Sequence, residues 1–165
     1  MRSCRVARIR AEPSVFEVPV EVGTMHPIRV FASFDRNRDA DLGERLLGQS
    51  RSSDSPFEVA DWSGNGPVSG GANGDESLRE RMDRVDALIV LCGEHTDSSI
   101  DVSLELRTAQ DQHKPYFLIR GRRELTCTKP VGAKPDDSLY TWIWQILKLR
   151  IGSEMRRVAA LGSAA

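Results

Sequence analysis

The sequence predicts a single α/β domain, in which a parallel sheet is covered by helices on both faces. Three observations support this prediction. Short apolar segments alternate with segments of helical periodicity along most of the chain. The segment ALIVLCG, residues 87–93, is almost continuously apolar, which is typical of a central parallel strand buried on both faces. The 165 residues are also enough to form one hydrophobic core.

The first half of the chain predicts two strands and two helices. Residues 28–34 (IRVFASF) and 57–62 (FEVADW) are rich in the β-branched and aromatic side chains that strands favour. Residues 39–50 and 75–86 repeat apolar side chains at helical spacing. These are Leu42, Leu46 and Leu47 in the first segment, and Leu78, Met82 and Val85 in the second.

The second half continues the alternation. Residues 98–110 (SSIDVSLELRTAQ) predict a third helix, which opens on the capping-box-like pair Ser98 and Asp101. Residues 115–121 (PYFLIRG) predict a fourth strand, and residues 138–151 (SLYTWIWQILKLRI) predict an amphipathic closing helix. Because crossovers are right-handed, the economical arrangement is a flavodoxin-like three-layer sandwich with four or five parallel strands in the order 2-1-3-4.

Composition excludes several classes of function. The 23 basic and 24 acidic side chains give a net charge of −1, which argues against a nucleic-acid or membrane surface and favours a small-molecule or protein partner. The three cysteines, Cys4, Cys92 and Cys127, have no CxxC spacing, so we expect neither a disulfide framework nor a metal site. This pattern favours a reducing cytoplasm. No apolar run approaches the ~18 residues of a membrane helix.

The two ends of the chain differ from its middle. Residues 1–24 hold few core-forming positions, so we expect an N-terminal extension of uncertain order. Either Met25 is the true start, or VFEVPVEV forms a short hairpin arm. Residues 25–151 form the predicted domain. Residues 152–165 are expected to be a tail, a fraying helix followed by a disordered end.

The carboxyl ends of the strands mark the expected ligand site, because parallel sheets of this kind bind ligands at that edge. Nine residues there follow the first three strands and are the candidate binding residues: Ser33, Phe34, Asp35, Arg36, Asp61, Trp62, Gly93, His95 and Thr96. We expect five of them, Phe34, Asp35, Asp61, Trp62 and His95, to surround one concavity together with Glu105. His95 could equally be a solvated loop residue. The glycine-rich stretch 64–74 contains no GK[ST], so it is not a Walker loop.

Glu105 is the residue whose position most needs an explanation. In the third predicted helix it lies about 65° from the centre of the apolar stripe, at ~100° per residue, and therefore at the margin of the core. It lies about two turns into that helix, so its side chain could face the carboxyl edge of the sheet. The residues alone also allow an ordinary boundary carboxylate paired with a Lys or Arg.

The segments VFASF, FEVADWS, VDALIVLCGEHTDSS and IDVSLELRTAQDQHKPYFLI together resemble the Toll/interleukin-1 receptor (TIR) domain. The resemblance spans residues 28–120. Within this family, the sequence more closely resembles the bacterial branch that includes the ThsB proteins of Thoeris anti-phage defence. Ser33 and Phe34 match the Ser-aromatic pair that ends the first TIR strand. Glu105 and Leu106 match the Glu-aliphatic pair of the helix after strand three.

The resemblance implies an activity and its substrate. In catalytic TIR domains this glutamate is needed to break the nicotinamide–ribose bond of NAD, so Glu105 is the candidate catalytic residue and NAD is a substrate, not a cofactor. The product would be ADP-ribose or a cyclic isomer that a separate effector protein senses. The loop 64–74 would gate the pocket and mediate TIR–TIR self-association into homo-oligomers.

Two other functions remain open. Many TIR domains have a tryptophan four residues before the glutamate, where this sequence has Asp101. A non-catalytic TIR-like interaction module would use the same fold to bind another TIR domain. A nucleoside deoxyribosyltransferase-like enzyme shares the sheet and an active-site glutamate. The positions of Tyr116 and Tyr140, at a strand start and in the predicted last helix, count against the second alternative.

Overall fold

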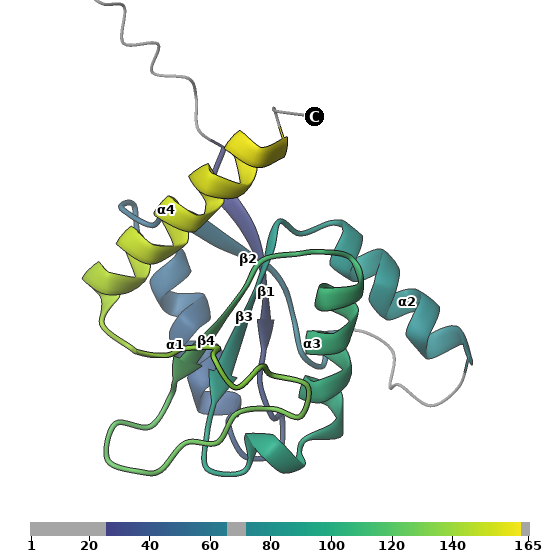
Figure 1. Ribbon diagram of the computed structural model, residues 1–165. Coiled ribbons are helices and arrows are strands. Elements are labelled where there is room, and N and C mark those ends of the chain that lie inside the picture. The colour runs from purple at the N-terminus through teal and green to yellow at the C-terminus, as the bar shows by residue number, and fades with distance from the viewer. Residues whose placement is uncertain (1–25, 66–71, 163–165) are drawn as a thin grey trace, which may run out of the picture.

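A computed structural model describes residues 26–65 and 72–162 (Figure 1). The predicted N-terminal extension 1–24 and the middle of the predicted loop 64–74 lie outside these residues. No helix among the described residues is both long and apolar enough to span a membrane.

The fold is a five-stranded, all-parallel sheet in the order β2-β1-β3-β4-β5. The strands are β1 (Ile28–Ser33), β2 (Phe57–Trp62), β3 (Ala87–Cys92), β4 (Tyr116–Arg120) and β5 (Leu139–Thr141). Every residue of β3 is buried, because this strand lies in the middle of the sheet and is covered on both faces. The predicted flavodoxin-like order 2-1-3-4 and the central position of the apolar run are confirmed.

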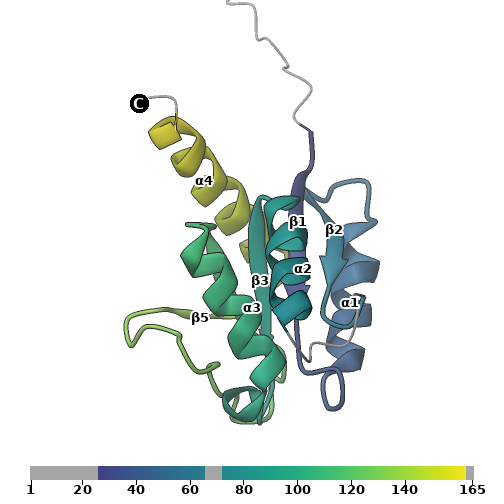
Figure 2. The same cartoon turned by 90° about the vertical axis from the view of Figure 1, so that its right-hand side faces the viewer.

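Two helices cover each face of the sheet (Figures 1 and 2). The helices are α1 (Ala40–Ser50), α2 (Ala72–Asp83), α3 (Ile100–Asp111) and α4 (Trp144–Gly162), with a 3₁₀ turn, η1 (Thr96–Ser98), before α3. Helices α1 and α4 pack on one face, where Leu46 and Leu147 are buried. Helices α2 and α3 pack on the other, where Met82 and Leu106 are buried. Alternate side chains of each strand therefore enter different cores.

The closing segment departs from the prediction. Residues 138–151 do not form one helix: β5 comes first, with Ile119 of β4 paired to Tyr140, and α4 begins only at Trp144. A strand of three residues is too short to show a period of two, so its apolar side chains extended the helical pattern. Helix α4 then continues to Gly162, past the predicted domain boundary at residue 151.

The start of α3 also differs from the prediction. Ser98 lies in η1, where its hydroxyl donates to the carbonyl of His95. Ser99 is the residue that precedes α3, and its side chain makes no capping hydrogen bond. The predicted capping box of Ser98 and Asp101 is therefore wrong, because the η1 turn takes up Ser98 and moves the capping position by one residue, to Ser99.

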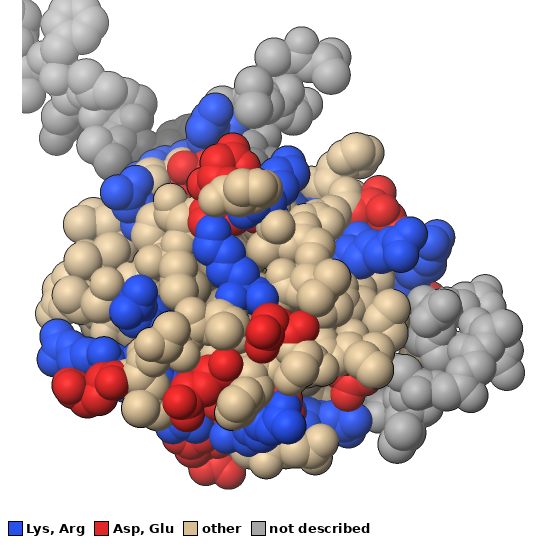
Figure 3. All heavy atoms as spheres, turned by 60° about the horizontal axis from the view of Figure 1, so that its bottom comes forward, with Lys and Arg blue, Asp and Glu red and all other residues tan. Residues whose placement is uncertain are grey.

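Because the five strands are parallel, their carboxyl ends lie at one edge of the sheet. The arrow of β1 points to this edge, toward the bottom of Figure 1. The surface over this edge carries interspersed acidic and basic side chains, as Figure 3 shows. A surface of mixed charge agrees with the absence of a strongly basic composition. Within the described residues, no group of three or more His, Cys, Asp or Glu side chains could hold a metal ion.

Candidate active site

Glu105 lies at the centre of a small buried hydrogen-bond cluster. Its Oε2 accepts hydrogen bonds from the hydroxyl of Ser33 at 2.5 Å and from the hydroxyl of Ser63 at 2.7 Å. Ser63 Oγ in turn accepts from the backbone N–H of Phe34 at 3.0 Å. Glu105 is only 6% exposed, and Ser33 is fully buried. The ends of β1 and β2 thus hold one carboxylate oxygen of α3 in place.

Burial dominates the electrostatics of Glu105. Loss of water around the carboxylate raises the pKa of Glu105 to about 7, against the opposing effect of hydrogen bonds from Ser33 and Ser63. The negative charge of Asp101 raises this pKa further, and the positive charge of Arg81 lowers it. Glu105 is therefore present in both protonation states near neutral pH. A carboxylate poised in this way is more typical of a functional site than of a surface.

No Lys or Arg within the described part of the chain forms an ion pair with Glu105. The simpler reading of this residue, a boundary carboxylate with a cationic partner, therefore does not describe its contacts. Its two hydrogen bonds to described residues both end on Oε2. Among the same residues, none donates a hydrogen bond to Oε1.

Asp61 was expected to contact a ligand, but its carboxylate is paired with an arginine. Arg81 of α2 donates to both of its oxygens, from Nε at 2.8 Å and from a terminal nitrogen at 2.7 Å, and also to the carbonyl of Trp62 at 2.9 Å. The same guanidinium lies over the ring of Phe31, 5.1 Å from its centroid. Both ionic side chains are 16% exposed. This pair ties the end of β2 to α2, beside the Glu105 cluster.

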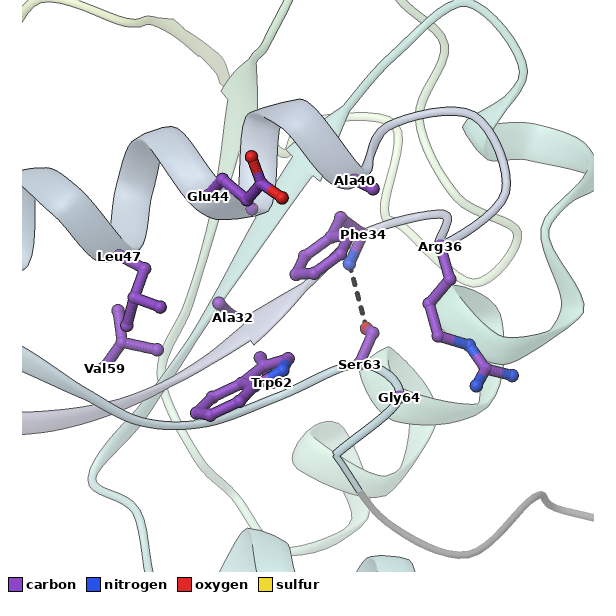
Figure 4. Close-up of a pocket in the computed structure, with 11 residues that line it drawn as sticks. Ala32, Phe34, Arg36, Ala40, Glu44, Leu47, Val59, Trp62, Ser63 and Gly64 are labelled. Atoms are coloured by element: carbon purple, nitrogen blue, oxygen red, sulfur yellow. Dashed lines mark hydrogen bonds between the residues drawn. The ribbon is translucent and has the colours of Figure 1, made fainter.

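A cavity of about 300 Å³ lies between α1 and the ends of β1 and β2. Figure 4 shows the rings of Phe34 and Trp62 on two sides of this space, with Leu47 and Val59 at one end and Arg36 at the other. We call it the α1 cavity. Ser63, whose hydroxyl donates to Glu105, is also one of the residues that line it.

A second cavity, of about 490 Å³, contains His95 and the buried Asp39. Arg122 donates to Asp39 at 3.1 Å and to Asp41 at 2.7 Å. Burial raises the pKa of Asp39, although the bond from Arg122 opposes the shift. Gly93 packs against this carboxylate, because a Cβ at Gly93 would lie 2.3 Å from Asp39 Oδ2.

Two other candidate binding residues form hydrogen bonds within the loops at this edge of the sheet. Thr96 is fully buried, and its hydroxyl accepts from the backbone N–H of Gly93 at 2.8 Å. Asp35 accepts from the backbone N–H of Asn37 at 2.9 Å, which closes the turn after β1. These contacts give Thr96 and Asp35 a structural role.

The described structure divides the expected residues between two cavities and a buried cluster, which lie side by side at the carboxyl edge of the sheet. Phe34, Arg36 and Trp62 share the α1 cavity, whereas His95 lies in the second cavity and Glu105 is buried on the α3 side. The cause is the alternation of side chains along β1, which sends Ser33 toward α3 and Phe34 toward α1. Consecutive residues therefore lie on opposite faces of the sheet, and Ser63 connects the two.

Sequence reasoning missed three kinds of residue. Ser63 follows β2 directly, so its place in the chain could have indicated it. Arg81 had a weaker signal, namely that Asp61 at a strand end needs a cationic partner. The α1 side of the cavity is formed by residues at helical spacing that share one face: Ala40, Gly43, Glu44 and Leu47.

Comparison with known families shows to which family the chain belongs. A model of the Thoeris protein ThsB, TIR-like domain, matches residues 31–124. The chain belongs to this ThsB TIR-like family. The matched range contains Ser33, Ser63 and Glu105, and so the whole hydrogen-bond cluster. The resemblance to bacterial TIR domains is thereby confirmed. A search of curated proteins gives no match.

Proposed function

We propose that this ThsB TIR-like protein cleaves NAD at the nicotinamide–ribose bond, with Glu105 as the catalytic residue, and acts in anti-phage defence. The observation that supports the proposal best is the buried Glu105 carboxylate, held by Ser33 and Ser63 at the carboxyl edge of the sheet. The family match supports the same reading, since it names the Thoeris system. The product would be ADP-ribose or a cyclic isomer.

The chemistry fits a single carboxylate. Breaking an N-glycosidic bond passes through an oxocarbenium-like state, which a nearby negative charge stabilises. That charge acts more strongly in a site with little water. The nicotinamide ring of NAD is a positively charged pyridinium, and it becomes neutral nicotinamide when the bond breaks. The leaving group therefore needs no proton from a general acid. Ionised Glu105 is the form that would stabilise the transition state.

The contacts of Glu105 suggest how it would act. Ser33 and Ser63 fix Oε2, which leaves Oε1 to approach the ribose. Asp101 lies one helical turn nearer the start of α3 and forms an ion pair with Arg36 at 3.2 Å. Both partners are partly exposed.

The proposal includes the partners of the enzyme. NAD is the substrate, the assembled form is a homo-oligomer held by TIR–TIR contacts, and a separate effector protein senses the product. The site is expected to work in the cytoplasm, where NAD is abundant. Neither a nucleic acid nor a membrane is needed for this chemistry.

The experiment compares nicotinamide release by the wild type, Glu105→Gln and Glu80→Gln, alone and with phage-infected lysate. Glu80 is an exposed residue of α2 and provides the matched control. We expect wild type and Glu80→Gln to release nicotinamide, and Glu105→Gln to be slower by about 10²–10³-fold or more. Chromatography of the products separates linear from cyclic ADP-ribose. Equal rates for all three proteins would exclude Glu105 as the catalytic residue.

A non-catalytic interaction module is the second candidate. Its support is an exposed apolar surface beside α3, where Ile100 is 75% exposed and Val131 is 67% exposed. Both residues border a surface cavity of about 580 Å³. Under this reading, no condition produces nicotinamide, and substitution of Glu105 changes nothing but partner binding.

A further inference from the structure

We infer that the α1 cavity binds the uncharged purine base of a nucleotide, with the base stacked on the ring of Trp62 and bordered by the ring of Phe34. The inference deepens the proposed function and rests on it for the choice of NAD, whose adenine would be the base. It assigns the adenine end of NAD to this cavity, whereas Glu105 would cleave the bond at the nicotinamide end. Four observations on the described residues support it.

The first observation is the shape and chemistry of the walls. Two aromatic rings, Phe34 from the end of β1 and Trp62 from the end of β2, border the same space (Figure 4). Leu47 and Val59 close one end with aliphatic side chains. Flat heteroaromatic bases stack on aromatic side chains, and their edges tolerate an aliphatic surface. A cavity of about 300 Å³ is large enough for a base with part of its sugar.

The second observation is that helix α1 makes room for one of these rings. The Phe34 ring lies directly against Gly43, where a Cβ would stand 2.4 Å from the ring. Any larger residue at this position would push the ring into the cavity. Phe34 is itself only 7% exposed, so its ring is held firmly in the wall. A ring that is fixed before the ligand arrives loses little entropy on stacking.

The third observation concerns charge. The lining contains two charged residues, Glu44 and Arg36, and both are exposed. Arg36 is already paired with Asp101. Glu44 is exposed to solvent, so moving the cationic pyridinium of NAD between apolar walls would cost hydration that this carboxylate offsets only in part, whereas neutral adenine has no such cost. The exposed carboxylate of Glu44 is in place for the polar edge of the base.

The fourth observation links the cavity to the proposed catalytic residue. Ser63 lines the cavity, accepts from the backbone N–H of Phe34 and donates to Glu105. A base seated against Trp62 therefore lies one side chain away from the Glu105 cluster. The rest of the dinucleotide would then reach from the mouth of the cavity toward the α3 side of the sheet.

In the test, the full-length protein is titrated with adenosine, AMP, nicotinamide mononucleotide and ribose 5-phosphate. Binding is measured by isothermal titration calorimetry and ligand-observed NMR. We expect adenosine and AMP to bind, and the other two to bind at least tenfold more weakly. Trp62→Ala should weaken AMP binding at least fivefold, and Trp62→Phe, which keeps a ring, should restore most of it. Ala40→Phe, at an exposed position on the rim, should block the cavity without changing the core.

The result does not depend on catalysis. AMP binding that these variants weaken as described supports the inference even if NAD is never cleaved. Three results would overturn the inference while leaving the proposed cleavage intact: no AMP binding, AMP binding that Trp62→Ala and Ala40→Phe leave unchanged, or nicotinamide mononucleotide binding more tightly than AMP.

Discussion

Glu105→Gln is expected to stabilise the folded protein at high pH and to have a smaller effect at low pH. Burial raises the pKa of Glu105 from 4.5 to about 7, so the folded protein holds this proton more tightly than the unfolded chain does. The stability linked to the protonated group is fully present below pH 4.5 and is lost as the pH rises through about 7. Glutamine carries no charge at any of these pH values and avoids the loss.

The magnitude follows from the two pKa values. The difference between 4.5 and about 7, at about 1.36 kcal/mol for each pH unit, corresponds to about 3 kcal/mol. Of this, roughly 2–3 kcal/mol is lost between about pH 5 and pH 8.5. At about 2–4 °C for each kcal/mol in a domain of this size, the melting temperature of Glu105→Gln should gain roughly 5–10 °C on the wild type across that range.

The assay is thermal unfolding, followed by circular dichroism, of the wild type, Glu105→Gln and Glu80→Gln at several pH values between these limits. Glu80→Gln should follow the wild type throughout, because its carboxylate is exposed. If the difference between Glu105→Gln and the wild type does not grow with pH, then burial of a titrating carboxylate at this position is the wrong explanation of its environment.

Three further substitutions test the surroundings of the site. Ser63→Ala leaves the buried N–H of Phe34 without its acceptor and should lower the free energy of unfolding by about 1–3 kcal/mol, measured by urea titration; an unchanged midpoint would contradict this. Asp61→Asn weakens the two hydrogen bonds from Arg81 and should lower the free energy of unfolding by about 1–3 kcal/mol in the same titration. A wild-type value would show that the contact is dispensable. Gly43→Ala should lower the melting temperature, because the new Cβ would overlap the Phe34 ring, whereas Gly48→Ala, in open space, should not; equal melting temperatures would show that the ring moves freely.

Much of the fold was predictable because strand-helix alternation and crossover handedness leave few topologies. The central strand was the clearest case, since burial on both faces produces the unbroken apolar run at 87–91. Strand β5 was not predictable in the same way. Among the described strands, its three residues pair with β4 alone, and this pairing depends on how the chain after Arg120 returns to the sheet.

The site was predictable in part for the same physical reason. The strand ends place Ser33 and Ser63 at one edge, and helix periodicity places Glu105 at the border of the core. Which partners these side chains choose depends on tertiary packing. The contact of Arg81 with Asp61 requires the docked position of α2, and no local pattern in the chain encodes that position.

The pH dependence of NAD cleavage tests the central claim most directly. Nicotinamide release is measured from pH 5.5 to 9 for the wild type and Glu105→Gln under the condition in which the wild type is active. In the proposed mechanism the ionised carboxylate is the active form, and its pKa is about 7, so the rate should rise with pH and level off above that value. Glu105→Gln should remain at least about 10²-fold slower across the range. A variant that matches the wild type at every pH would contradict the account.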